Sequence, residues 1–242
     1  MEESKHHEKT RKGKKVFDKT TILIGLVTVL ILFNQVQTNA ISDSINGFAT
    51  GSSGGFSSGN VNLQSVDVTQ IQSTAQGVAA LFPIGDIKTA DDAIAVMIQT
   101  GTPDYGESMG VSFDDPIASM NFMANAYPAL KKQAQEDPEV WQLYLSLAAA
   151  PRGISCEFCC GIGAQGVTKD GNLRCGCKHN PAAQTIALWL IMNTDYTDAE
   201  ILREVYNWKT LFFPKNMVGL AAQIAGGDIS VLDDLPGMVG GC

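Results

Sequence analysis

The sequence predicts a mainly α-helical protein: an N-terminal transmembrane helix, a flexible Gly/Ser tether, and a small helical domain with one cysteine-rich hairpin loop. Three observations lead to this prediction. Residues 20–41 form an uncharged, largely apolar run, helix-start signals recur after residue 60, and five of the six cysteines fall between residues 153 and 180. Strand-like alternation is scarce, so the cysteine loop is the stretch where we expect a hairpin.

The first 41 residues resemble a membrane anchor. A basic tail at residues 1–19 precedes the uncharged run at 20–41, and a helix of about 20 apolar residues crosses a hydrocarbon core about 30 Å thick. A cleaved signal peptide is the competing interpretation, but apart from Ala40 the small residues of a cleavage site are missing. We favour an uncleaved signal anchor of the cell membrane, with the basic tail cytoplasmic and the bulk of the chain extracytoplasmic.

Residues 42–60 are rich in glycine and serine, so they predict a flexible linker. The chain carries a net charge of −8, and an acidic surface disfavours nucleic acid as a partner because phosphate binding needs basic residues. The remainder divides into a helical subdomain at 61–152, a cysteine-loop and helical hairpin module at 153–214, and a C-terminal helix with a Gly-Gly-Cys tail at 215–242.

Capping signals place the helices of the domain. Three predicted starts share a capping Asp or Asn followed by proline, namely Asp115-Pro116, Asp137-Pro138 and Asn180-Pro181. The helix after Asn180 is apolar nearly all round, so we expect it to be the most buried helix.

Two further starts carry a threonine. Thr89, with an acidic first turn behind it, predicts a helix that Gly101 ends. Thr197 and Glu200 form a capping box that opens a helix reaching Pro214, and a shorter apolar helix follows it.

The cysteine loop has the spacing C-x-x-C-C, fourteen residues, then C-x-C-x-H. Asp170-Gly171 between the two clusters predicts a tight turn, and clusters at the two ends of a hairpin meet in space. Soft ligands that converge in this way form tetrahedral zinc sites and also suit Cu(I), with an iron–sulfur cluster as a weaker candidate. The preferred ligands are Cys156, Cys159, Cys175 and Cys177, and the alternates are His179, Cys160 and Cys242.

Two other interpretations of the loop stay open. Outside the membrane, thiols oxidise and structural disulfides persist, and Cys242 would complete three pairs. The loop also fits a working dithiol in which Cys175 attacks and Cys177 is its partner. The sequence thus indicates a metal site, a set of disulfides or a redox pair.

The segment from Leu173 to Pro214 is similar to the dithiol subunit of the cytochrome c maturation haem lyase. Its matching residues are Leu173, Arg174, Cys175, Cys177 and Asn180, followed by the helix entry at 197–201, although C-x-C stands here where that family has C-x-x-C. The triplet Cys175-Gly176-Cys177 also resembles exported lipoproteins named for a P-C-Y-C-G-C motif, which are presumed metal binders. Both resemblances imply a membrane-attached, exported cysteine module.

These features together predict a membrane-anchored extracytoplasmic protein that binds a zinc or copper ion through its cysteine loop. The alternatives are a thiol–disulfide redox partner and a disulfide-stapled interaction domain without enzymatic activity. Expected partners are the membrane, through residues 20–41, and another exported redox or metal-handling protein.

Overall fold

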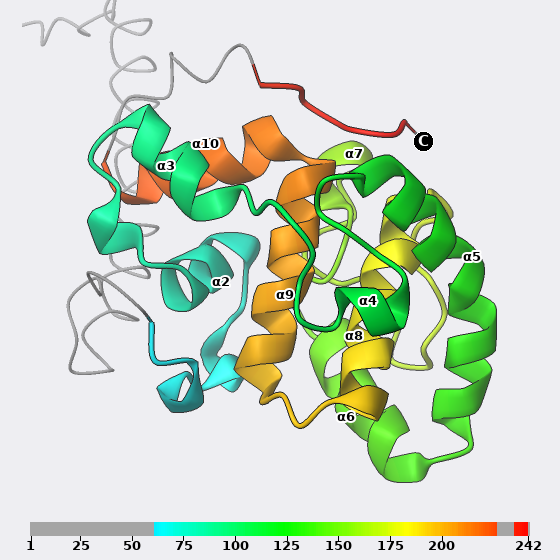
Figure 1. Cartoon of the computed structure of the whole chain (residues 1–242). Helices are drawn as coiled ribbons and strands as arrows, with labels where there is room; N and C mark the ends of the chain where they lie inside the picture. Colours follow the sequence, from blue (N-terminus) through cyan, green and yellow to red (C-terminus); the bar gives the residue numbers. More distant parts are fainter. Residues whose placement is uncertain (1–60, 227–234, 242) are drawn as a thin grey trace, which may run out of the picture. The chain divides into compact units, whose positions relative to one another are not determined.

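The computed structural model describes residues 61–226 and 235–241, which belong to one compact unit (Figure 1). The predicted basic tail, anchor, linker and Cys242 lie outside the described residues. Within those residues, no helix is both long enough and apolar enough to cross a bilayer. The helices are α2 (Thr74–Leu81), α3 (Ala90–Met97), α4 (Gly106–Met109), α5 (Pro116–Gln135), α6 (Pro138–Ala148), α7 (Glu157–Cys160), α8 (His179–Asn193), α9 (Asp198–Phe212) and α10 (Pro214–Ile224).

The hairpin of α8 and α9 forms the centre of the domain (Figure 1). Helices α5 and α6 pack on α8, while α2 and α10 pack on α9 and α3 covers α10. The predicted mainly helical domain is confirmed, and the described residues contain no strand longer than a single bridge. The prediction that α8 is the most buried helix is wrong, because α9 buries 11 of its 15 residues and α8 buries 10 of 15.

Most predicted helix starts are confirmed by their caps. The Asp115 carboxylate accepts a hydrogen bond from the amide of Ala118 at 3.1 Å, and Asp137 caps α6 in the same way. Thr197 and Thr89 each open a helix with a full capping box. The α3 helix nevertheless ends at Met97, before the predicted stop, because Ile98 already has an extended backbone.

Asn180 has a different task from the predicted cap. The α8 helix begins at His179, so Asn180 lies inside its first turn, fully buried. Its Nδ2 donates to the carbonyl of Gly166 at 2.9 Å and to the carbonyl of Cys175 at 3.2 Å. The side chain therefore anchors the cysteine loop to α8, because loop carbonyls buried there need a donor.

Candidate metal centre

The first cysteines lie on the short helix α7. Cys156 is the residue before its first turn and is buried, whereas Cys160 is its last residue and is exposed. Gly161 then ends the helix with a left-handed backbone, φ +64°. Since residues four apart lie on the same side of a helical turn, the Cys156 and Cys160 sulfurs face one direction.

The second pair is carried back to the first by the predicted turn. Val167 and Leu173 form a single antiparallel bridge, and the amide of Thr168 donates to the carbonyl of Asn172 at 2.8 Å. Gly171 adopts φ +74° at the turn, a backbone conformation that glycine adopts without steric cost. The hairpin is thus shorter than two strands, yet it returns the chain to α7.

Four sulfurs converge as the loop spacing predicts. The Sγ atoms of Cys156, Cys160, Cys175 and Cys177 all lie within 4.8 Å of one another. The closest pairs are Cys160 with Cys175 at 2.8 Å, Cys156 with Cys177 at 3.0 Å, and Cys175 with Cys177 at 3.4 Å. Tetrahedral zinc with bonds of about 2.3 Å separates its sulfurs by about 3.8 Å. The four thiols therefore fit a soft metal ion after a small outward shift.

Cys160, and not the preferred Cys159, belongs to this group of four. Cys159 is exposed and its thiol interacts with that of Cys160 at the edge of the group. Successive residues of a helix point about 100° apart, so two neighbours cannot both face one central point. The left-handed Gly161 ends the turn after Cys160, and Cys160 is the member of the adjacent pair that faces the second cluster.

His179 lies beside the group but is engaged elsewhere. Its Nε2 donates to the carbonyl of Val239 at 2.8 Å, and its ring packs on Phe212 and Phe213. Burial lowers the pKa of His179, against the effect of that hydrogen bond, and so favours the neutral imidazole. Its Nδ1 is buried without a hydrogen-bond partner among the described residues. A ligand role for His179, and any role for Cys242 outside the described residues, stays a prediction.

Cys156, Cys160 and Cys175 differ in acidity. Burial raises the pKa of Cys156, and hydrogen bonding to Cys177 raises it further. The hydrogen bond with Cys175 raises the pKa of Cys160 to about 12. Burial works against ionisation of Cys175 as well, but hydrogen bonds from Cys160, Cys177 and Cys156 outweigh it and lower the Cys175 pKa to about 7. In the metal-free protein, Cys175 is thus the first of the three to become a thiolate.

An amide network inside the domain supports the second pair. The Gln184 Nε2 donates to Asn180 Oδ1 at 2.9 Å and to the carbonyl of Ile154 at 3.3 Å. The Tyr144 hydroxyl donates to Gln184 Oε1 at 3.0 Å. Through Asn180 this network reaches the carbonyl of Cys175, so the backbone at the second cluster is fixed by neutral groups.

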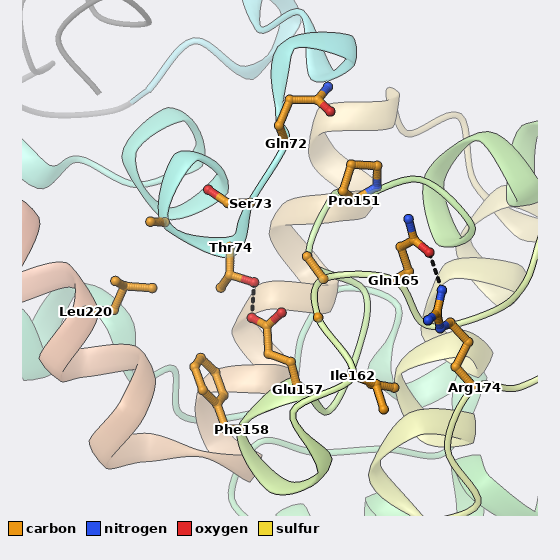
Figure 2. Close-up of a pocket in the computed structure, with 13 residues that line it drawn as sticks. Gln72, Ser73, Thr74, Pro151, Glu157, Phe158, Ile162, Gln165, Arg174 and Leu220 are labelled. Atoms are coloured by element: carbon orange, nitrogen blue, oxygen red, sulfur yellow. Dashed lines mark hydrogen bonds between the residues drawn. The ribbon is translucent and has the colours of Figure 1, made fainter. Parts of the chain in front are cut away.

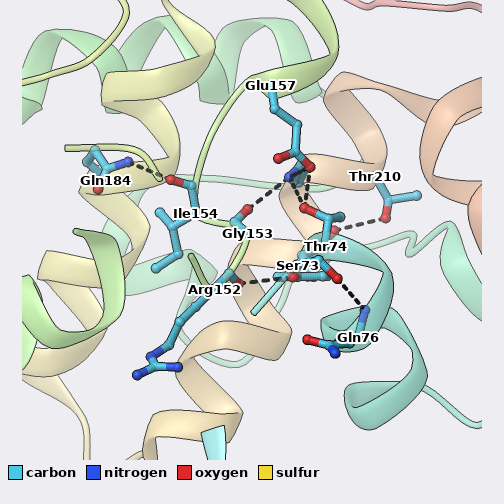
Figure 3. A network of polar contacts seen from close by, with 11 residues as sticks. Ser73, Thr74, Gln76, Arg152, Gly153, Ile154, Glu157, Gln184 and Thr210 are labelled. Carbon is cyan, nitrogen blue, oxygen red and sulfur yellow. Dashed lines mark hydrogen bonds and ion pairs between the residues drawn. The ribbon is translucent and has the colours of Figure 1, made fainter. Parts of the chain in front are cut away.

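A buried ion pair supports the first pair. Lys209 on α9 is 1% exposed and its Nζ lies 3.0 Å from the carboxylate of Glu157, the residue after Cys156. Nζ also donates to the carbonyl of Gly153 at 2.9 Å and to the Thr74 hydroxyl at 3.1 Å. The Thr74 hydroxyl in turn donates to Glu157 (Figure 3). Neither Lys209 nor Thr74 was identified as a site residue from the sequence.

An open pocket of about 600 Å³ borders the cysteine loop (Figure 2). Thr74 and Phe158 line it, together with Glu157, which follows Cys156, and Arg174, which precedes Cys175. The guanidinium of Arg174 donates to Gln165 Oε1 across the loop. The pocket gives solvent access to the loop next to both clusters.

No protein-family model matches the chain, and neither a curated protein nor a solved structure is significantly similar to it. The function is therefore inferred from the geometry of the chain itself.

Proposed function

We propose that the protein is a membrane-anchored, extracytoplasmic metal-binding protein whose ion is held by Cys156, Cys160, Cys175 and Cys177. The observation that carries the proposal is the convergence of these four sulfurs within 4.8 Å from two segments of the chain. Four thiolates are soft ligands that select Zn²⁺ or Cu(I) over the hard cations Mg²⁺ and Ca²⁺. A structural zinc site is closed by four such ligands, whereas a copper carrier exchanges its ion with a partner.

The cellular setting in this proposal depends on residues 1–60. The basic tail and the uncharged run at 20–41 support a single-pass anchor with the domain outside. Unprotected thiols are oxidised to disulfides in an oxidising compartment. A bound ion protects the four thiols because their sulfurs are then coordinated.

Metal titration of the full chain with single Cys→Ser variants tests the site. The reduced protein, in detergent, is expected to bind one Zn²⁺ and to give the absorption of tetrahedral thiolate-bound Co²⁺. Serine at position 156, 160, 175 or 177 should abolish that spectrum, while Cys159→Ser, the matched control, should keep it. Absence of binding by the wild-type chain, or loss of the spectrum in Cys159→Ser, would contradict the proposal.

A thiol–disulfide partner is the second candidate, and the arrangement of sulfurs in two facing pairs favours it. Cys156 faces Cys177 and Cys160 faces Cys175, so two cross-links could close without moving the backbone far. In each step a thiolate of this chain attacks the disulfide of a partner protein, and a mixed disulfide forms between the two proteins. The facing thiol of this chain then attacks the mixed disulfide, closes the bridge and releases the partner. The chain loses two electrons and two protons per bridge, and the partner is reduced to a dithiol.

Intact mass measured under native and denaturing conditions separates the two candidates. A retained ion with alkylatable thiols supports the metal site. A deficit of two hydrogens per pair, mapped to Cys156–Cys177 and Cys160–Cys175, supports the redox partner. The resemblance of residues 173–214 to the haem lyase dithiol subunit belongs with this second candidate.

A further inference from the structure

Lys209 is unusual because a lysine is almost never fully buried unless it is paired. An ammonium group has three donors, and here all three are used: on the Glu157 carboxylate, the Gly153 carbonyl and the Thr74 hydroxyl. Aromatic rings surround the same nitrogen, with Phe158 at 5.0 Å and Tyr206 at 5.7 Å from Nζ to ring centroid. Three hydrogen-bond acceptors and two aromatic rings therefore fix the position of Nζ.

The partners of Lys209 lie on both sides of Cys156. Gly153 precedes Cys156 by three residues and Glu157 follows it directly, so one ammonium group holds the two ends of the segment that carries this ligand. Gly153 leaves no room for a side chain, because a Cβ built there would meet the Tyr206 hydroxyl of α9. The position of the Cys156 sulfur is consequently set from α9.

An ion pair at this place is not explained by stability alone. Desolvation of two charges offsets much of their attraction, and apolar residues of similar volume often replace such a pair without loss. The electrostatic demand of a thiolate site gives a reason for it. Four thiolates around a divalent ion leave a net charge of −2. Lys209, paired with the residue next to Cys156, is the one lysine or arginine that is fully buried among the described residues.

We propose that Lys209, held by Glu157 and Thr74, is a positioning residue for the metal centre, which sets the Cys156 sulfur and supplies a buried positive charge beside it. This inference rests on the proposed function. Groups that orient metal ligands from outside the ligand set typically contribute about 10- to 100-fold to metal affinity. The expected loss on removing the Lys209–Glu157 pair therefore lies in that range.

The test uses the full chain with the double substitution Lys209→Met and Glu157→Gln, which removes both charges and leaves neither one buried alone. We expect a folded protein whose Zn²⁺ affinity, measured by competition with a chromophoric chelator, is about 10- to 100-fold weaker. Its Co²⁺ spectrum should be altered, and Cys156 should be alkylated faster in the metal-free state. The matched control, Lys132→Met at an exposed position of α5, should behave as the wild type.

The single substitution Glu157→Gln serves if the double variant fails to fold, because it keeps the side-chain shape, an oxygen that accepts from Lys209, and the Lys209 charge. It tests the positioning role alone, and an altered Co²⁺ spectrum with faster alkylation of Cys156 is expected. A folded variant with wild-type affinity, spectrum and alkylation rate would overturn the positioning role while leaving the metal site intact. A wild-type chain that binds no metal in the same titration would overturn the proposed function itself.

Discussion

The two halves of the cysteine cluster are held by different kinds of contact. Cys175 is fixed through its carbonyl by Asn180, a neutral amide backed by Gln184. The segment of Cys156 is fixed by the charged pair of Lys209 and Glu157. A neutral network loses one or two hydrogen bonds when it is cut, whereas a cut ion pair leaves a buried charge without its partner. Substitutions that cut the support of the Cys156 half should therefore lower the free energy of unfolding more than substitutions that cut the support of the Cys175 half.

The largest effect is expected from Glu157→Leu. It leaves the Lys209 ammonium buried with two neutral oxygen partners, which should lower the free energy of unfolding by about 3–5 kcal/mol. Urea denaturation of the metal-free, reduced protein measures this without a contribution from the ion. Glu136→Leu, at an exposed residue, is the matched control and should stay within about 0.5 kcal/mol of the wild type.

Asn180→Leu should have the next largest effect. The carbonyls of Gly166 and Cys175 lose their donor, and buried unsatisfied groups cost about 1–3 kcal/mol. Asn193→Leu provides the control, because Asn193 is exposed at the other end of the same helix. A greater loss for Asn180→Leu than for Glu157→Leu, in the same denaturation experiment, would reverse the comparison of the two halves.

The smallest effect, seen only as a pH dependence, concerns Glu204, a carboxylate that forms no ion pair with a lysine in the described part of the chain. Burial raises the pKa of Glu204 above its ordinary value, although hydrogen bonds from Tyr105 and Asn207 oppose the rise. A raised folded pKa means that the native state holds its proton longer than the unfolded state. The contribution of protonated Glu204 to the free energy of unfolding is thus complete below the unfolded pKa of about 4.3. This contribution is lost as the pH rises through the pKa of Glu204 in the folded protein.

Glu204→Gln should remove this dependence. Wild-type stability is expected to fall relative to the variant as the pH rises above about 4.3, and the difference should become constant beyond the folded pKa. Urea denaturation across this pH range checks the sign. A wild-type protein that gains stability relative to the variant in that window would show that the hydrogen bonds from Tyr105 and Asn207 outweigh burial.

Local signals in the sequence were enough to place most helices. The Asp-Pro starts at 115 and 137 and the capping boxes at Thr89 and Thr197 depend on residues within one turn, so they were predictable. The convergence of the cysteine clusters was also predictable, because Asp170-Gly171 specifies the turn between them. The predicted start at Asn180 is wrong, since its side chain bonds to loop carbonyls five and 14 residues before it instead of to the amides of its own first turn.

Packing between distant segments decides which cysteine of the adjacent pair joins the group of four, and it also decides that Lys209 supports the segment of Cys156. The C-x-x-C spacing favours Cys159 over Cys160, and only the orientation of α7 on the domain brings Cys160 into the group of four instead. In the sequence Lys209 resembles an exposed lysine in the last turn of a helix, where it would favour the helix dipole. It is buried because α2 and the cysteine loop both cover that side of α9.

The contact between His179 and Val239 connects the cluster to a segment that follows it by some sixty residues. The Val239 amide donates to the carbonyl of Phe212 at 2.9 Å while its carbonyl accepts from His179, two residues after Cys177. Linkage is reciprocal: if ion binding shifts the start of α8, it changes the docking of residues 235–241, and docking then changes ion affinity by the same factor. A fluorophore at Gly237, where an added side chain meets open space, therefore offers an optical signal for loading of the site.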